Sequence, residues 1–312
     1  MDFVLKTFGL CKKYKKQLVV NNADITISRG DIYGFVGENG SGKTTIIRLI
    51  TGLIFSDAGR FELFGIDSTS KEIIQARSKV GAVVESPSIY KNMSAYDNLK
   101  TQCIILGIPA DERIDKTLNE VGLGDLINDK KHVGNFSLGM RQRLGIAMAL
   151  LGEPEFLILD EPMNGLDPAG IVEIRELILK LNREKNITFL ISSHILSELS
   201  LVATKYGIIS KGRIIKEITA EHLKEEMSKT TDIIVKNPDK LYEMIVGLYG
   251  EKNILYIPNG VRIKGEVNLN ELLSCVIAND IYIISVNCKQ SSFEDYYLET
   301  IGGERYDRTS QI

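Results

Sequence analysis

The segment GENGSGKT, residues 37–44, constrains the fold of this chain more than any other stretch. It fits the pattern G-x-x-x-x-G-K-[ST], follows the apolar run IYGFV and precedes the helical pattern TTIIRLITGL. In such a strand–loop–helix unit the glycines let backbone amides curl around phosphate oxygens, and the helix directs its positive end to the same place. The segment therefore predicts an α/β domain that binds a nucleotide, with a plain glycine-rich turn as the alternative.

The residue types of this loop predict separate contacts with a nucleotide. Lys43 is expected to reach the β- and γ-phosphates, and the Thr44 hydroxyl is expected to ligate Mg²⁺. The full predicted nucleotide-binding stretch consists of Gly37, Glu38, Asn39, Gly40, Ser41, Gly42, Lys43, Thr44 and Thr45.

A second buried strand ends in two carboxylates. Residues 156–161 read FLILDE, and an acidic strand end beside a phosphate loop is where Mg²⁺ needs an oxygen ligand. Because neighbouring residues on an extended strand point to opposite sides, Asp160 and Glu161 can take different roles. Asp160 is expected to hold Mg²⁺, directly or through a water, and Glu161 to polarise the attacking water. The alternative is an exposed Asp-Glu-Pro turn after a core strand.

The order of strand and helix patterns predicts two domains. Residues 1–218 alternate between strands and helices, which is typical of a parallel α/β core, and a helical block at about 86–152 looks inserted into it. Residues 219–312 show the order βαββαβ, which predicts a small α+β domain with the ferredoxin-like arrangement.

Composition limits the partners and the compartment. A net charge of −3 does not suggest a nucleic-acid partner. Four cysteines lie far apart in the sequence and predict neither a zinc site nor a disulfide framework, which fits a reducing cytoplasm. The N-terminus lacks the apolar core of a signal peptide, and no charge-free apolar run reaches the about 18 residues of a membrane span.

Three further motifs occur in a fixed order around the acidic strand. FSLGM (136–140) precedes it, NGLDP (164–168) follows it, and Ser193-His194 ends the next strand. Together with the phosphate loop and the acid pair, this order resembles the nucleotide-binding subunits of ATP-binding cassette (ABC) proteins over about residues 3–218. The resemblance implies a P-loop NTPase fold with a RecA-like core and a helical subdomain, which hydrolyses ATP with Mg²⁺.

The resemblance also implies roles for single residues. The family's signature, usually LSGGQ, reads FSLGM here, so Ser137 and Gly139 remain while the first glycine and the glutamine do not. In the family this segment binds the γ-phosphate held by a second subunit, which implies a head-to-tail dimer of two copies; a simple helix cap at Ser137 is compatible with that role. By the same resemblance Asp167 belongs to the loop between the two sites, and His194 bonds the γ-phosphate. Tyr14 would stack on adenine, although surface tyrosines beside lysines are common.

Glu85 raises a separate question, because it follows the apolar residues 82–84, where burying a charge is costly. A solvated strand end is the simple interpretation. In ABC proteins this loop normally begins with Gln and couples hydrolysis to a membrane subunit. Glu85 is therefore expected to act in catalysis and beside Mg²⁺, near Asp160 and Glu161, with one of the three carboxylates keeping its proton until Mg²⁺ arrives.

Exporters that confer bacitracin resistance or lantibiotic immunity commonly have this glutamate and a similar short C-terminal unit. The chain resembles these exporters, and the resemblance implies that it is the ATPase subunit of a membrane exporter of peptide antibiotics. Two copies would lie on the cytoplasmic face of the membrane and bind an integral permease through residues 85–98. The substrate rests on analogy alone. The alternative is a soluble ABC ATPase that serves as an assembly or regulatory factor.

Other phosphate-loop classes fit worse. A GTPase would carry an Asn-Lys-x-Asp motif that recognises guanine, and this sequence has none. Chromosome-maintenance ATPases have long heptad repeats, which are absent here, and translation-factor-like ABC proteins carry two cassettes in one chain, whereas this chain has one.

Overall fold

The structure, a computed structural model, describes residues 2–110, 112–227, 229–290 and 292–302. It divides the chain into two compact units, residues 1–220 and 221–312. Within the described ranges, no helix combines the length and the apolar composition that a membrane span needs.

A mostly parallel sheet forms the centre of the first unit. Its strands lie in the order β11 (Arg213–Thr219), β10 (Lys205–Ser210), β4 (Ile32–Val36), β9 (Thr188–Ser193), β8 (Phe156–Asp160) and β7 (Val80–Val83), with β11 antiparallel to β10. β4 and β8 are buried along their whole length, as their uninterrupted apolar runs predict. The register pairs Val36 with Ser193 and Asp160 with Ser192. The carboxyl ends of β4, β8 and β9 therefore lie together at one edge.

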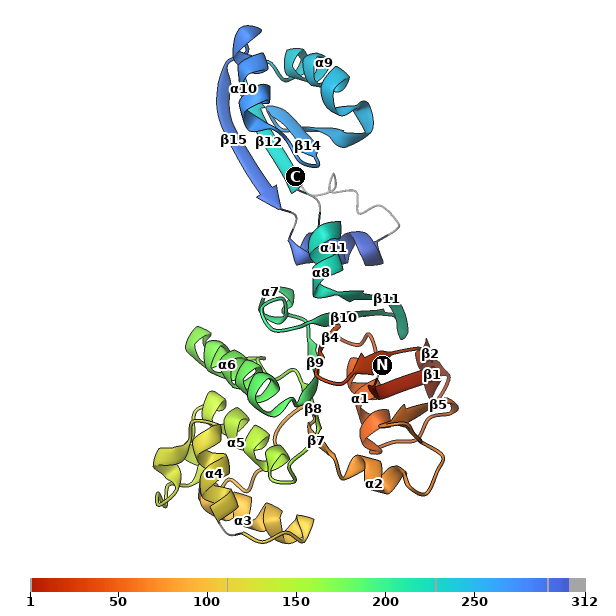
Figure 1. Ribbon diagram of the computed structural model, residues 1–312, viewed down its shortest axis with the longest axis vertical. Helices are drawn as coiled ribbons and strands as arrows, with labels where there is room; N and C mark the ends of the chain where they lie inside the picture. The colour runs from red at the N-terminus through yellow and green to blue at the C-terminus, as the bar shows by residue number, and fades with distance from the viewer. Residues whose placement is uncertain (1, 111, 228, 291, 303–312) are drawn as a thin grey trace. The chain divides into compact units, whose positions relative to one another are not determined.

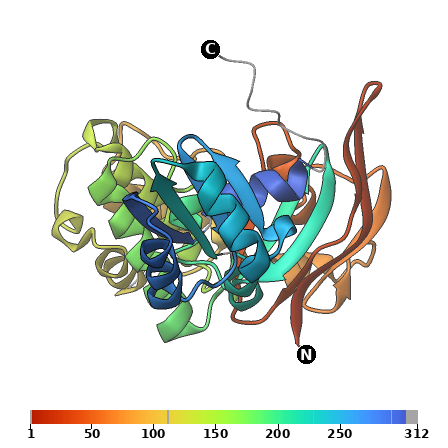
Figure 2. The ribbon, with the colours of Figure 1, turned by 90° about the horizontal axis from the view of Figure 1, so that it is seen from above.

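An antiparallel sheet covers one side of this core. It consists of β2 (Gln17–Ala23), β1 (Phe3–Tyr14), β5 (Ala58–Leu63) and β6 (Ile66–Asp67), with β3 (Thr26–Ser28) paired to β1. Helix α1 (Lys43–Thr51) buries Ile46, Ile47 and Ile50 in the hydrophobic core between the two sheets. Figure 1 shows the antiparallel sheet on one side of β8 and β9, and α5 (Leu138–Leu150) and α6 (Pro168–Lys185) on the other. Figure 2 shows the red and orange strands of this sheet on the side opposite the yellow-green helices.

The chain is helical between β7 and β8. After β7 it forms α3 (Ala95–Leu106), α4 (Glu112–Glu120), the short 3₁₀ turns η1 (Gly124–Leu126) and η2 (Val133–Asn135), and α5. Ser94 caps α3 and Ser137 caps α5 by accepting a hydrogen bond from a first-turn amide. The remaining helices of this unit are α2 (Ile73–Arg77) and α7 (Leu196–Leu199). The parallel α/β core with a helical block, predicted from the sequence, is confirmed.

The second unit has the ferredoxin-like order predicted from the sequence. Its strands lie as β13 (Ile254–Ile257), β14 (Gly260–Lys264), β12 (Lys229–Val235) and β15 (Ile283–Gln290), all antiparallel to their neighbours. α9 (Pro238–Tyr249) and α10 (Leu269–Ala278) pack on one face of this sheet (Figure 1). The unit also contains η3 (Glu251–Asn253), α11 (Phe293–Ile301) and most of α8 (Ala220–Glu226).

A charged pair lies on the opposite face of the second sheet. Arg262 donates two hydrogen bonds, of 2.6 and 2.8 Å, to the nearly buried carboxylate of Asp232 on the neighbouring strand, and these bonds lower the pKa of Asp232. Because this pKa is lowered in the folded state, the stabilisation is present above the unfolded pKa and is lost as the pH falls through the folded value.

We expect Arg262→Gln to lower the free energy of unfolding of the second unit by about 2 kcal/mol, because the Asp232 carboxylate then lacks its charged partner. Hydrogen exchange of the β12 amides in the full chain measures this change. The control is Lys229→Gln, which removes the exposed ion pair with Glu266 and should cost well under about 1 kcal/mol. Equal effects of the two variants would contradict the role of the Asp232 pair.

Candidate active site

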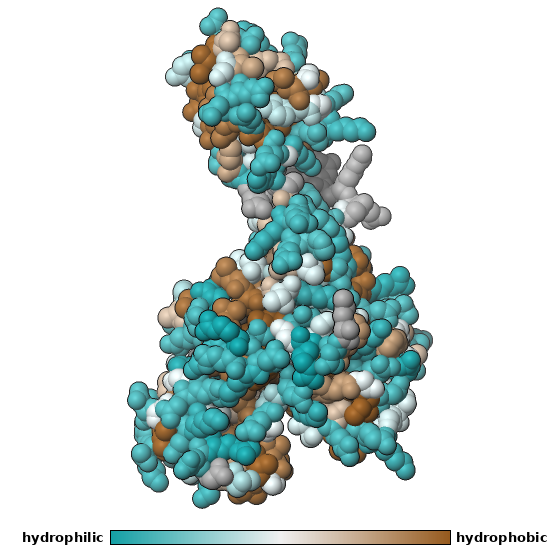
Figure 3. Space-filling view, in the orientation of Figure 1, coloured by the Kyte–Doolittle hydropathy of each residue, from teal (hydrophilic) through white to brown (hydrophobic). Residues whose placement is uncertain are grey.

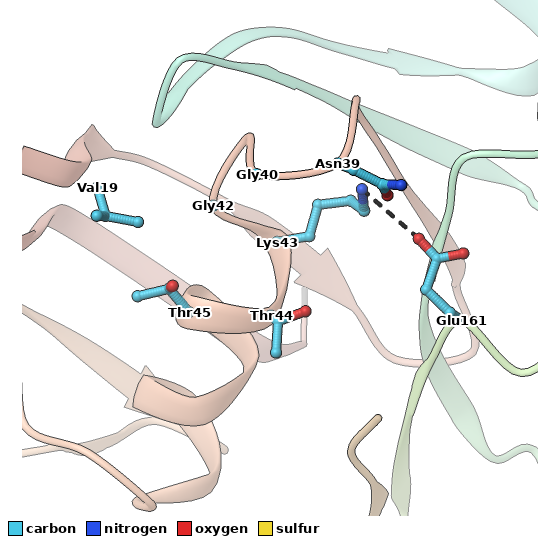
Figure 4. Close-up of a pocket in the computed structure, with 8 residues that line it drawn as sticks. All are labelled: Val19, Asn39, Gly40, Gly42, Lys43, Thr44, Thr45 and Glu161. Atoms are coloured by element: carbon cyan, nitrogen blue, oxygen red, sulfur yellow. Dashed lines mark ion pairs between the residues drawn. The ribbon is translucent and has the colours of Figure 1, made fainter. Parts of the chain in front are cut away.

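A cavity of about 170 Å³ lies at the carboxyl edge of the central sheet, beside the start of α1 (Figure 4). It is lined by Val19, Asn39, Gly40, Gly42, Lys43, Thr44, Thr45 and Glu161. The residues 39–45 of this set come from the predicted phosphate loop. Gly37, Glu38 and Ser41 belong to the same loop but do not line the cavity.

Lys43 is buried and held by its own loop. Its Nζ donates to the carbonyl oxygens of Gly37, at 2.6 Å, and Glu38, at 3.1 Å. The same atom lies 3.6 Å from the Glu161 carboxylate, the ion pair drawn in Figure 4. Among the described residues that line the cavity, Lys43 is the only cation, and it faces the space where a phosphate anion would lie.

The start of α1 is built to receive an anion. Gly42 occupies the N-cap position with φ 112° and supplies no side-chain cap, and no acidic residue lies in the first turn. The first amides of the helix consequently lack a carboxylate competitor, and the helix dipole adds a partial positive charge there. Both features fit a phosphate group in the cavity.

Asp160 ends β8 with a side chain that is about 1% exposed. Ser192 on β9 donates its hydroxyl to Asp160 Oδ1 at 2.5 Å. Within the described residues, Asp160 Oδ2 has no hydrogen-bond partner, although it is buried. A buried, unpaired carboxylate oxygen is costly unless something outside the chain binds it, and a hard cation is the fitting group.

Glu161 leaves the strand in a different direction. The sequence predicts that the strand includes both acids, but β8 ends at Asp160 and Glu161 adopts φ 53°. Its amide donates to Ser192 Oγ at 2.9 Å, and its carboxylate lies 2.7 Å from His194 Nδ1. The structure thus brings Glu161, His194 and Lys43 together, and a turn rather than strand alternation separates Glu161 from Asp160.

Ser137, Gly139 and Asp167 do not line this cavity. Ser137 caps α5, and Asp167 caps α6 through a 3.0 Å hydrogen bond from the Gly170 amide. The two helix starts lie side by side, since a Cβ on Gly139 would lie 3.8 Å from the Leu166 side chain. The signature residues and the Asp167 loop therefore form one surface, apart from the phosphate loop of the same chain.

Tyr14 lies at the end of β1, with a half-exposed ring and Lys12 Nζ 5.7 Å from the ring centroid. It does not line the cavity.

The structure does not bring Glu85 to the cavity. β7 ends at Val83, Glu85 adopts φ 61°, and its side chain is 61% exposed. The carboxylate pairs with Arg48 of α1 at 2.5 Å. The expected position near Asp160 and Glu161 is wrong, because the left-handed turn directs the chain out of the core and Arg48 neutralises the charge.

Two residues of the site, Ser192 and Val19, belong to none of the sequence motifs. Ser192 positions both acids by bonding Asp160 and the Glu161 amide. A polar residue within the apolar strand TFLIS was the available signal. Val19 lines the cavity only because β2 passes beside the phosphate loop, and no local pattern reveals that contact.

Comparisons with known proteins point to one family. The ABC transporter family model matches residues 20–164. The bacitracin transport ATP-binding protein BcrA of Bacillus licheniformis is 41% identical over 97% of this chain and 99% of its own length. The lantibiotic transport ATP-binding protein SrtF of Streptococcus pyogenes is 44% identical over 69% of this chain and 90% of its own.

Solved structures show the same fold. The structure of cbiO1 from Clostridium perfringens, part of the ABC transporter complex cbiONQ, has a TM-score of 0.65 and 28% identity over 72% of this chain and 92% of that one. The chain therefore belongs to the ATP-binding proteins of the ABC transporter family and is an ATP-binding cassette ATPase.

Proposed function

We propose that this chain is the ATP-hydrolysing subunit of a membrane exporter of peptide antibiotics of the bacitracin or lantibiotic type. The observation that carries the substrate class is the similarity to the bacitracin transport protein, which extends over 97% of this chain and so includes the second unit. The similarity to the lantibiotic transport protein covers 69% of the chain. Residues 1–218 would form the ATPase domain and residues 219–312 a family-specific addition.

The triphosphate of ATP would lie in the cavity at the start of α1. Amides of the phosphate loop would bind its oxygens, and Lys43 would leave Glu161 for the β- and γ-phosphates. Thr44 and Asp160 would hold Mg²⁺, which fits the unpaired Oδ2 of Asp160. When bound, Mg²⁺ would neutralise phosphate charge during transfer.

Glu161 would orient and polarise the attacking water. Its departure from the strand separates it from Asp160, so one carboxylate faces the cation and the other the water. His194, now 2.7 Å from Glu161, would bond the γ-phosphate and hold the Glu161 carboxylate in place.

A second copy of the chain would complete the site. Ser137, Gly139 and Asp167 share one surface and do not reach the cavity of their own chain. In a head-to-tail dimer the start of α5 would bind the γ-phosphate held by the partner, and Tyr14 would stack on the adenine within its own chain. The dimer would lie on the cytoplasmic face of the membrane.

A groove of about 710 Å³ fits the permease. It runs between the ends of α1 and α2 on one side and of α3 and α5 on the other, and residues 80–84 and 86–88 also line it. Leu53 and Leu106 line it while being 64% and 44% exposed. Hydrophobic surface borders the notch at this end of the unit in Figure 3. Such an apolar groove fits a helix of a membrane subunit.

Glu85 would then act at the permease-binding groove rather than at the nucleotide. Residues 86–88 line the groove, and Glu85 is tied to Arg48, which lies on the helix that follows the phosphate loop. This ion pair would connect the permease contact to the nucleotide-binding helix.

The double variant Leu53→Glu and Leu106→Glu tests this docking. Because two charges enter an exposed apolar groove, we expect co-purification with the permease from detergent extracts to fall by at least roughly tenfold. The ATPase activity of the isolated subunit should remain. The matched control is Leu201→Glu, which charges a leucine of similar exposure (55%) outside the groove.

The outcomes distinguish an exporter subunit from a soluble assembly or regulatory factor. Full retention of the permease by the double variant would remove the groove as its docking site. If the unmodified protein never yields a hydrophobic partner, the soluble assembly or regulatory factor replaces the exporter.

A further inference from the structure

The tip of the β10–β11 hairpin lies against the back of the phosphate loop. Lys211 and Gly212 form the turn, with φ values of 47° and 79°. The amide of Gly212 donates to the carbonyl of Ser41 at 2.9 Å, and the amide of Asn21 donates to the carbonyl of Gly212 at 2.8 Å. The turn thus connects the phosphate loop to β2.

No side chain fits at position 212. A Cβ there would lie 2.4 Å from the carbonyl oxygen of Val19. A Cβ on Gly42 would meet the same oxygen at 2.9 Å and lie 3.6 Å from the Cα of Gly212. Three backbone segments therefore meet at distances that only glycine permits.

The hydrogen bond to Ser41 fixes the direction of a phosphate-loop amide. In a planar trans peptide the C=O of one residue and the N–H of the next point to opposite sides. Because Gly212 holds the Ser41 carbonyl, the Gly42 N–H is directed away from the hairpin. Gly42 lines the cavity, and backbone amides are the donors that such loops offer to phosphate.

We propose that Gly212 is a positioning residue for ATP binding. It fixes the peptide plane between Ser41 and Gly42 and so orients a phosphate donor before the nucleotide arrives. This role belongs to the ATPase itself and does not depend on the exporter, so the ATP kinetics of the isolated subunit test it directly.

The first test is Gly212→Ala. The added Cβ displaces the turn from Val19 and weakens its bond to Ser41, so we expect the KM for ATP to rise roughly tenfold, with kcat changing by less than about threefold. The affinity for a fluorescent ATP analogue should fall in parallel.

The matched control is Gly65→Ala. Gly65 is the second residue of the turn between β5 and β6 and has φ 77°, but nothing lies within 4 Å of its Cβ position. The control carries the same backbone strain and should leave the KM for ATP unchanged.

A second variant distinguishes the effect of displacing the Gly212 amide from the effect of adding a Cβ. One glycine inserted after Gly212 lengthens the turn and displaces the amide without adding a Cβ, with a glycine inserted after Gly65 as its control. A similar rise in KM supports the positioning role. An unchanged KM in either folded Gly212 variant overturns it. Failure of both Gly212 variants to fold, while both Gly65 variants fold, would also overturn it in favour of a purely structural role.

Discussion

Glu161→Gln is expected to bind ATP about as well as the unmodified protein and to hydrolyse it roughly 100 to 1,000 times more slowly. Glutamine keeps the shape of the side chain beside His194, but it cannot accept the proton of the attacking water. ATP should therefore remain bound and stabilise the dimer. Phosphate release measures the rate, and size-exclusion chromatography with ATP and Mg²⁺ measures the dimer.

The control for this variant is Glu153→Gln. Glu153 is an exposed glutamate with φ 50°, close to the 53° of Glu161, and it does not line the cavity. Its substitution should leave turnover and assembly unchanged. Unchanged turnover in Glu161→Gln would remove Glu161 from the role of the base.

Asp160→Asn is expected to lose most of the activation of ATP hydrolysis by Mg²⁺. The amide can keep the hydrogen bond from Ser192, but it replaces a carboxylate oxygen with a neutral group at the unpaired Oδ2 position. We expect turnover at saturating ATP to fall by at least roughly 100-fold, because the cation loses its charged ligand. Phosphate release over a titration of MgCl₂ measures this loss.

Thermal unfolding distinguishes a loss of Mg²⁺ binding from a general loss of stability. With ATP and EDTA, Asp160→Asn and the unmodified protein should gain similar stability, since the phosphate loop is intact in both. Adding Mg²⁺ should stabilise only the unmodified protein further. The same Mg²⁺-dependent gain in both proteins would contradict the assignment of Asp160 to the metal.

The sequence predicted the elements that rest on local chemistry. The strand, loop and helix of residues 32–51 could be predicted because a glycine-rich phosphate-loop pattern that follows an uninterrupted apolar run is specific for this unit. The ferredoxin-like order of the second unit was readable because each strand and helix carries its own period, and the hairpin at residues 258–259 has its turn residues.

Positions that depend on a backbone turn were not readable in the same way. Glu85 and Glu161 both follow apolar strands, and both adopt left-handed φ values that glutamate rarely takes. For Glu161 the turn directs the carboxylate toward Lys43 and His194, whereas for Glu85 it directs the carboxylate to Arg48 at the surface. The same local pattern therefore leads to two different positions, one beside the cavity and one at the surface.

The sequence alone predicts the nucleotide chemistry of this protein, because residue type, order and adjacent secondary structure single out Lys43, Thr44, Asp160, Glu161 and His194. Only the tertiary structure decided how these groups are held. Ser192 joins the two acids across neighbouring strands, and Gly212 reaches Ser41 of the phosphate loop from a hairpin about 170 residues further along the chain. Such contacts depend on where segments far apart in the sequence meet in the fold, and neither local periodicity nor composition predicts which segments those are.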